Sequence, residues 1–349
     1  MSSVKDVAHG SRRNAYTALI LSTLAMIVCF MSWSNFAPLA SQVAEMFNLD
    51  VSQRTLLLAT PVLLGSIMRI PVGILSDRYG GKKVYLILMA FILIPLIMIP
   101  HVHSFGMLLF AALLVGMSGT SFAVGVSYAS VWFPPEQQGL ALGIVSMGNM
   151  GNAVAAMTLP YISKAAGFDS VYYFLIILTV IFGVLFAVFC KEMPVDKSKT
   201  IKGALSVATD SGTWYLSLFY FLTFGLFVAF TNLTPTFLTG MFHYTPVTAG
   251  LYSALFAFVC TLVRPFGGYL ADRKRPMALL QWVFVAIVIF AIWIMLSFHN
   301  QFMFIAGIVL VGLSAGIGNG VVFKMVPYVS QGNTGAVTGF VGAVGGLGG

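Results

Sequence analysis

The chain has 349 residues, of which 59% are hydrophobic and only 8% are charged, and its mean hydropathy is +0.95. This composition excludes an ordinary soluble domain and indicates an integral membrane protein. The formal net charge of +8 would suit a nucleic-acid partner, but the positions of the basic residues, described below, exclude that class.

Eleven apolar stretches follow one another with short connections, and a helix needs about 20 apolar residues to cross the hydrocarbon core. They lie near residues 17–40, 54–76, 84–100, 105–132, 138–162, 171–190, 213–240, 248–271, 277–298, 302–329 and 333–349. The first is long enough to stay in the membrane and follows a polar, basic segment, so we expect no cleaved signal peptide. Cys29, Cys190 and Cys260 lie far apart within the apolar segments, which indicates neither a disulfide framework nor a metal site.

The basic residues fall almost entirely on one side when the N-terminus is placed in the cytoplasm. Only Arg54 and Lys164 then lie outside, while Arg69, Arg264 and Lys324 lie within spans. The residues on the inner side are Lys5, Arg12, Arg13, Arg78, Lys82, Lys83, Lys191, Lys197, Lys199, Lys202, Arg273, Lys274 and Arg275. Because cytoplasmic loops are enriched in Lys and Arg, we expect a multi-pass protein of the cell membrane with a cytoplasmic N-terminus and no nucleic-acid partner.

Two apolar segments 195 positions apart share one pattern, RIPVGILSDR at 69–78 and RPFGGYLADR at 264–273. Arg, Gly, Leu, Asp and Arg recur at the same positions, which indicates an internal duplication. We therefore predict an all-α protein with two six-helix halves, 1–190 and 213–349, joined by a cytoplasmic linker at 191–212 and facing each other around a central site. The sequence stops within the eleventh apolar stretch, so we expect the second half to be incomplete and to lack a twelfth span.

Each repeated segment opens on an arginine, eight positions before its aspartate. At a rise of about 1.5 Å per residue, Arg69 and Arg264 lie roughly 12 Å from these interfacial aspartates, near the middle of a core about 30 Å thick. All 10 acidic residues lie in loops, tails or helix ends, so we expect no carboxylate partner at this depth. Because arginine keeps its charge and is costly there, the pair predicts an anion site. A planar anion suits two guanidinium forks.

The first repeated segment continues into a loop with Gly80 and Lys82 and resembles the loop 2–3 motif of the major facilitator superfamily. The second resembles the degenerate copy of that motif in loop 8–9. Glycines let two helices approach closely, and charges at helix ends form contacts that one transporter state makes and the other breaks. The residues expected to act in this gating are Gly73, Asp77, Arg78, Gly268, Asp272 and Arg273.

A glycine-rich pattern occurs twice, at 139–152 and 335–349, and resembles the paired signatures of the nitrate/nitrite porter family. The segment 315–327 resembles the tenth span of that family. Close helix packing would explain the glycines alone but not the two buried arginines, and the resemblance covers essentially the whole chain. It implies a major facilitator fold and transport of nitrate or nitrite. The signature glycines expected at close helix contacts are Gly148, Gly151, Gly345 and Gly346.

The same resemblance implies further residues at the substrate. The tyrosine and phenylalanine of the seventh span are Tyr220 and Phe224, the phenylalanine of the fourth is Phe122, and the asparagine of the fifth is Asn149. Hydroxyl and amide groups donate hydrogen bonds to an anion, and flat rings favour a flat ion. Aromatic residues make up 14% of the chain, so a single phenylalanine without the shared motif would indicate only packing.

No obvious proton relay accompanies the arginines, since the five histidines lie at segment edges or in tails. We therefore expect anion exchange: two facing cations resist closing of the empty site, and a bound anion relaxes their repulsion. The alternative is proton-coupled symport, for which Lys324 is a candidate titratable group, or else a third positive charge of the cavity. Trp33, Asn35 and Asn319 also lie within spans, where the sequence does not separate lining from packing roles.

Other classes of protein fit the sequence less well. An enzyme is disfavoured, because no nucleophile–base pair, metal cluster or nucleotide-binding loop is evident, and we expect no cofactor. A carrier for organic cations would need buried acids, and a sensor would need a soluble output domain. We predict a monomeric transporter whose partners are the small anion and the lipid bilayer.

Overall fold

The computed structural model describes residues 12–194, 205–329 and 333–348, and all regular structure within these ranges is helical. In chain order the elements are α1 (Arg12–Trp33), α2 (Ala40–Phe47), α3 (Val51–Ile67), α4 (Arg69–Tyr79), α5 (Gly81–Met98), η1 (Ile99–His101), α6 (Phe105–Val115), η2 (Gly116–Thr120), α7 (Ser121–Ser130), η3 (Pro135–Gln137), α8 (Gln138–Ser146), η4 (Met147–Met150), α9 (Gly151–Ala166), α10 (Phe168–Phe189), η5 (Ser206–Thr209), α12 (Ser211–Phe242), α13 (Pro246–Leu262), α14 (Arg264–Arg273), α15 (Pro276–Leu296), α16 (Gln301–Val329) and α17 (Thr334–Gly346). Within the described ranges, 10 helical spans are long and apolar enough to cross a membrane, and α17 is a shorter apolar helix. The predicted all-α membrane fold is confirmed.

Two of the predicted spans contain a break directly before an arginine. The second span consists of α3 and α4, interrupted at Met68 (ψ −9°), and the eighth consists of α13 and α14, interrupted at Val263 (ψ −10°). Pro71 and Pro265 follow within three residues of the breaks and have no amide hydrogen with which to continue the helical hydrogen bonding. Each repeat therefore starts a new helix segment inside the membrane, with its arginine as the first residue.

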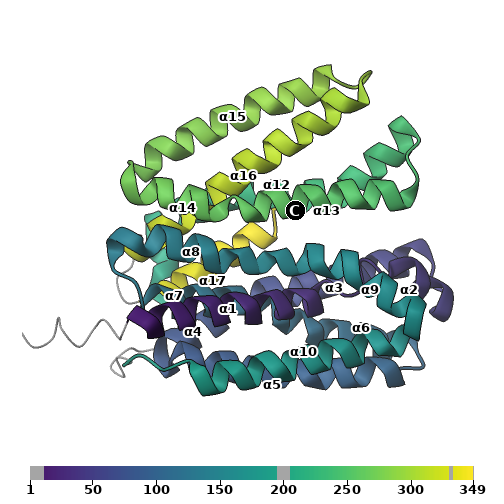
Figure 1. The fold of residues 1–349 in the computed structure, drawn as a ribbon, viewed down its shortest axis with the longest axis horizontal. Coiled ribbons are helices and arrows are strands. Elements are labelled where there is room, and N and C mark those ends of the chain that lie inside the picture. Colours follow the sequence, from purple (N-terminus) through teal and green to yellow (C-terminus); the bar gives the residue numbers. More distant parts are fainter. Residues whose placement is uncertain (1–11, 195–204, 330–332, 349) are drawn as a thin grey trace, which may run out of the picture.

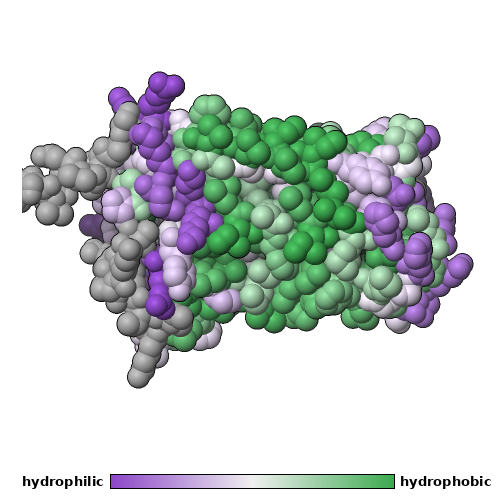
Figure 2. Space-filling view, turned by 90° about the horizontal axis from the view of Figure 1, so that it is seen from below, coloured by the Kyte–Doolittle hydropathy of each residue, from purple (hydrophilic) through white to green (hydrophobic). Residues whose placement is uncertain are grey.

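The outer surface has the character expected of a protein surrounded by lipid. Figure 2 shows a broad hydrophobic band across the middle of one face and hydrophilic side chains at both ends. Large exposed hydrophobic residues lie on the spans, for example Ile87 on α5, Val184 on α10 and Val288 on α15. Helices satisfy their own backbone hydrogen bonds, which is required where lipid replaces water.

The helices run roughly side by side, with α12, α13, α15 and α16 on one side of the bundle and α1, α5, α6 and α10 on the other (Figure 1). The glycine-rich helices α8 and α17 lie between these groups; α17 packs against α4 and α12, and α8 packs against α14. Thus each glycine-rich helix contacts the helix that carries the arginine of the other repeat. The end of the bundle at which α4 and α14 finish carries Asp77 and Asp272 and is called the Asp end below.

The predicted linker at 191–212 falls partly outside the described residues, because 195–204 are not described. The division of the chain into halves at 1–190 and 213–349 stays a prediction. The eleventh predicted span, 333–349, corresponds to α17, which ends at Gly346.

Candidate anion-binding site

Arg69 is the first residue of α4 and is only 1% exposed. Its Nε donates to the carbonyl oxygen of Gly119 at 3.2 Å, and its Nη1 donates to that of Gly342 at 2.7 Å. Its guanidinium carbon lies 5.5 Å from the centroid of the Phe122 ring. No carboxylate among the described residues pairs with it, so carbonyl dipoles and an aromatic ring, rather than a counter-ion, surround this charge.

Arg264 holds the equivalent place at the start of α14 and is fully buried. Its Nη1 donates to the carbonyl oxygen of Ser146 at 3.4 Å. With the Asn149 amide oriented so that its oxygen faces the guanidinium, this oxygen accepts from Nη1 at 2.5 Å and from Nη2 at 3.2 Å. The Nε of Arg264 has no hydrogen-bond partner within the described structure. Here too, no described carboxylate balances the charge.

Equivalent contacts from opposite repeats hold the two arginines. Arg69 donates to Gly342 on α17, and Arg264 donates to Ser146 at the end of α8, 196 positions earlier in the chain. Each guanidinium is therefore anchored by the glycine-rich helix of the other repeat. Such reciprocal contacts are what a symmetric arrangement of duplicated halves produces.

Aromatic rings from three helices pack around this place. Tyr220 and Phe224 on α12 stack with their centroids 4.9 Å apart, and Phe122 on α7 stacks on Tyr220 at 6.1 Å. Phe323 on α16 meets both Phe122 and Tyr220 edge to face, with centroids 4.8 Å apart in each pair. The rings form an apolar wall against which a flat ion can lie, and aromatic faces also attract the guanidiniums electrostatically.

Both arginines lie near the ring of Phe224. The guanidinium carbon of Arg69 is 5.9 Å from its centroid, and that of Arg264 is 5.7 Å from it. The hydroxyl of the fully buried Tyr220, one turn earlier on α12, has no hydrogen-bond partner in the described part of the chain. The residues predicted from the sequence to contact substrate thus lie together in the structure, and they are Arg69, Arg264, Tyr220, Asn149, Phe122 and Phe224.

The sequence reasoning missed two aromatic residues of this cluster. The first is Phe323, and the second is Phe227, whose ring centroid lies 5.4 Å from the guanidinium carbon of Arg264. Phe227 follows Phe224 by three residues on one helix, so it shares that helix face. Phe323 lies in the segment 315–327 that resembles the tenth span of the family. Phe227 could have been found by extending the predicted Phe224 by one helical turn.

At the Asp end, Asp77 joins α4 to the first turn of α17. Its Oδ1 and Oδ2 accept from the backbone nitrogens of Gly335 and Ala336, both at 2.9 Å, and Oδ1 also accepts from the Ser127 hydroxyl at 3.0 Å. A carboxylate is favourable there because the first amides of a helix are unpaired and its dipole is positive. Gly73 and Gly335 lie so close that a Cβ on either would overlap the backbone of the other.

Asp272 makes the equivalent contact between α14 and α8. Its Oδ1 and Oδ2 accept from the backbone nitrogens of Gly139 at 2.9 Å and Leu140 at 2.8 Å. Gly268 meets Gly139 as closely as Gly73 meets its partner in the other repeat. In both repeats, the glycine and aspartate predicted to act in gating therefore contact the start of a helix that belongs to the other repeat.

Lys324, expected from the sequence to line the cavity or to be linked to a proton, takes part in an ion pair at the Asp end. Its ammonium forms an ion pair with Oδ1 of Asp272 at 2.6 Å, donates to the carbonyl oxygen of Pro135, and is 4% exposed. Lys324 thus belongs to the contact between α14 and α8 at the Asp end, away from the two arginines. The sequence could not show this pairing, because the partners lie on helices that are not consecutive in the chain.

The remaining predicted residues have distinct surroundings. The guanidinium carbon of Arg78 lies 5.4 Å from the Tyr79 ring, and that of Arg273 lies 4.3 Å from the Tyr269 ring. These two arginines therefore contact tyrosine rings beside the aspartate contacts, consistent with cation–π attraction.

The signature glycines all lie at close helix contacts. Gly148 and Gly151 pack against α1, where an added Cβ would overlap its side chains or backbone. Gly345 packs against the ring of Tyr220, and Gly346 against the hydroxyl of Ser66. Glycine at position 345 thus leaves room for a predicted substrate residue.

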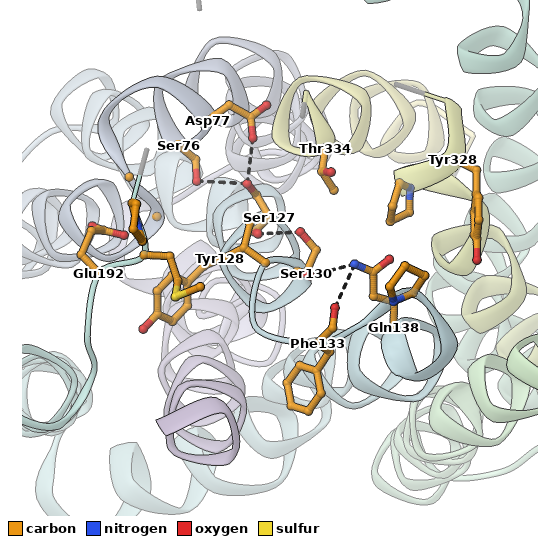
Figure 3. A pocket seen from close by; sticks show the side chains of 17 residues that line it. Ser76, Asp77, Ser127, Tyr128, Ser130, Phe133, Gln138, Glu192, Tyr328 and Thr334 are labelled. Atoms are coloured by element: carbon orange, nitrogen blue, oxygen red, sulfur yellow. Dashed lines mark hydrogen bonds between the residues drawn. The ribbon is translucent and has the colours of Figure 1, made fainter. Parts of the chain in front are cut away.

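A cavity of about 500 Å³ lies at the Asp end, between α4, α7, α16 and α17. Hydroxyl and amide side chains line it: the Ser76 hydroxyl donates to that of Ser127 at 3.4 Å, and Gln138 reaches in from α8 (Figure 3). Neither Arg69 nor Arg264 lines this cavity, and both are buried. The arginine cluster is therefore separated from the cavity in this conformation.

Known proteins with similar sequences are membrane transporters. The family model of the Major Facilitator Superfamily matches residues 22–349. The nitrite extrusion protein of Bacillus subtilis (strain 168) is 37% identical over 336 residues, which cover 95% of this chain and 84% of that protein. The probable nitrate transporter NarT of Staphylococcus carnosus (strain TM300) is 36% identical over 332 residues, which cover 95% of this chain and 85% of that protein.

Solved structures show the same fold at low sequence identity. The human organic anion transporter MFSD10 (TETRAN) has a TM-score of 0.76 at 14% identity, covering 96% of this chain and 91% of that chain. The proton:xylose symporter XylE has a TM-score of 0.76 at 12% identity, covering 97% and 87%. The chain is thus a multi-pass membrane transporter, not an enzyme, and it belongs to the nitrate/nitrite porter family of the major facilitator superfamily.

Proposed function

We propose that this protein carries nitrate and nitrite across the membrane by alternating access, with the anion held between Arg69 and Arg264. The observation that carries the proposal is the convergence of these buried guanidiniums on the Phe224 ring, with no described carboxylate beside either. Guanidinium forks suit the O–N–O edges of a planar anion, and an aromatic face suits its plane. Relatives named nitrite extrusion protein and nitrate transporter support the choice of anion.

Exchange of nitrate for nitrite is the transport mode that these charges favour. Two permanent cations repel each other in a low-dielectric interior. An empty carrier has to reorient without relief of this repulsion, whereas an anion between the cations offsets it, so only the loaded carrier reorients readily. Proton-coupled symport is the alternative, but Lys324, its candidate group, is paired with Asp272 at the Asp end.

We further propose that the Asp end faces the cytoplasm and that the protein works as a monomer in the cell membrane. Arg78, Lys82, Lys83, Arg273 and Lys274 all lie at or just beyond the ends of α4 and α14, as expected of the cytoplasmic side. The six proposed binding residues all come from one chain, so no second copy is needed to complete the site. In this orientation, the contacts of Asp77 and Asp272 close the cytoplasmic side.

Counterflow in proteoliposomes tests both the substrate and the transport mode. Labelled nitrate is supplied outside vesicles that contain nitrite, nitrate or no transported anion, with and without a pH gradient. We expect uptake only when an internal anion is present, without acidification of the lumen. Uptake into anion-free vesicles together with acidification of the lumen would show that the transport mode is symport and not exchange. Absence of transport of either anion under every condition would reject the proposed function.

A further inference from the structure

Asn319 on α16 corresponds by the internal duplication to Phe122 on α7. The two helices are aligned by their contacts at the Asp end, where Ser127 donates to Asp77 and Lys324 donates to Asp272. Ser127 and Lys324 are 197 positions apart, and the same shift takes Phe122 to Asn319. The repeats therefore place an aromatic ring beside Arg69 and an amide at the corresponding position of α16.

The side chain of Asn319 is enclosed and has no partner. The residue is 0% exposed, and neither Oδ1 nor Nδ2 has a hydrogen-bond partner in the described structure. Leaving a buried amide unpaired is unfavourable, so such groups in native proteins call for an explanation. A role in binding a ligand is one explanation, provided that the side chain faces the binding site.

Neighbouring contacts on α16 fix the direction of this side chain. On one side, Gly318 packs against Thr223 of α12, and on the other side Gly320 packs against the backbone of Arg264 on α14. Asn319 lies between these two directions, and Phe323, one turn later on the same face, touches the rings of Phe122 and Tyr220. The amide is thus directed between α12 and α14, toward the arginine cluster.

Two other unpaired donors lie on the same side of the cluster. They are the Nε of Arg264 and the hydroxyl of Tyr220. The corresponding Nε of Arg69 is satisfied by the carbonyl oxygen of Gly119. The second repeat therefore presents three buried donor groups without acceptors, counting the Asn319 amide. In the first repeat Nε of Arg69 is satisfied, and the Ser66 hydroxyl is a buried donor without an acceptor. A small oxyanion has the acceptors that this side lacks.

We propose that Asn319 is a further substrate-contacting residue, whose Nδ2 donates to an oxygen of the anion bound beside Arg264 and which thereby favours nitrate over nitrite. The inference rests on the proposed function. A guanidinium fork engages two oxygens at once. Nitrite has only these two, whereas nitrate has a third, to which the Asn319 amide can donate.

The test replaces Asn319 by leucine, which has a similar size and no polar atoms. Nitrate and nitrite affinities are measured on the purified full chain by ligand-induced shift of the melting temperature and by calorimetry. We expect nitrate affinity to fall about tenfold or more, since a hydrogen bond to a charged group is lost, and nitrite affinity to fall less. The unliganded melting temperature should not fall, because the deleted group makes no hydrogen bond within the described protein.

Thr213→Val is the matched control. Its hydroxyl is equally buried and unpaired, but it lies at the start of α12, two turns before Tyr220. Nitrate and nitrite affinities should both stay unchanged, which would separate a substrate contact from the general effect of deleting an unpaired buried group.

Asn319→Asp is the second variant and keeps the shape of the side chain. Its carboxylate would compete with the anion for Arg264, so binding of both nitrate and nitrite should be lost. If the unchanged protein binds nitrate and Asn319→Leu binds it equally well, the role of Asn319 is rejected and the proposed function stands. Equal losses of nitrate and nitrite affinity in Asn319→Leu would reject the selectivity. If the unchanged protein binds neither anion, the proposed function fails, and the inference fails with it.

Discussion

The ammonium of Lys324 lies 2.6 Å from Oδ1 of Asp272, and both side chains are more than nine-tenths buried. At the equivalent place in the first repeat, Asp77 accepts from the uncharged hydroxyl of Ser127 at 3.0 Å. The Asp272 contact at the Asp end thus includes an ion pair that is removed from water.

This ion pair predicts that Lys324→Met weakens the contact between α14 and α8. Asp272 would keep its two backbone donors but lose its counter-ion in a buried place, so we expect a loss of about 2–4 kcal/mol of unfolding free energy. Unfolding in detergent measures it. Lys164→Met, which removes an exposed lysine at the opposite end, should change stability by less than about 0.5 kcal/mol. Equal stability of the two variants would contradict a structural ion pair.

Gly268→Ala should drive α14 and α8 apart. A Cβ at this position would overlap the backbone of Gly139, and overpacking of this kind costs about 1–3 kcal/mol. Because the contact closes the Asp end, we expect slower nitrate uptake and faster labelling of a cysteine introduced by Ser130→Cys in the cavity.

Gly250→Ala is the control for this change, since nothing lies within 4 Å of the added Cβ on α13. It should leave uptake and labelling unchanged and stabilise the helix by up to about 1 kcal/mol. If both alanine variants transport at the normal rate, the close glycine contact has no role in gating.

Arg69→Lys and Arg264→Lys should each abolish transport although the charge is retained. The Arg69 guanidinium spans the carbonyls of Gly119 and Gly342, and an ammonium cannot reproduce this fork. Each charge-assisted hydrogen bond to the anion that lysine cannot make corresponds to about tenfold or more in anion affinity. Uptake of labelled nitrate measures the effect, with the exposed Arg54→Lys as control. Normal uptake by either variant would show that charge alone suffices.

Asn149→Asp should neutralise the charge of Arg264 with a carboxylate of the protein itself. The amide oxygen already accepts from both Nη atoms of Arg264, so a carboxylate there forms an ion pair with the guanidinium and displaces the anion. We expect loss of nitrate binding with no loss of thermal stability, which calorimetry and melting curves can separate. Retained nitrate affinity would mean that Arg264 does not hold the anion.

The sequence predicted the spans well, because they depend on local composition and helical spacing. The breaks before Arg69 and Arg264 were not predicted, although Pro71 and Pro265 mark them. A long apolar run hides such a break, since its residues are hydrophobic on both sides of the proline.

The contacts that were missed are those between helices distant in the chain. Pairing of Lys324 with Asp272, and convergence of Phe323 on Tyr220, depend on how the helices pack. The repeated pattern aligns Asp77 with Asp272. The correspondence of Ser127 with Lys324 appears only in the structure, from their contacts with these two aspartates.

Each repeat binds the first turn of a helix that belongs to the other. Asp77 on α4 accepts from backbone amides of α17, and Asp272 on α14 accepts from those of α8. Rocking the repeats apart would strip the partners from the amides of both helices in a single movement. Keeping one aspartate contact while breaking the other would strain the bundle and still expose two unpaired amides. The Asp end should accordingly open and close in one cooperative step, with no stable half-open state.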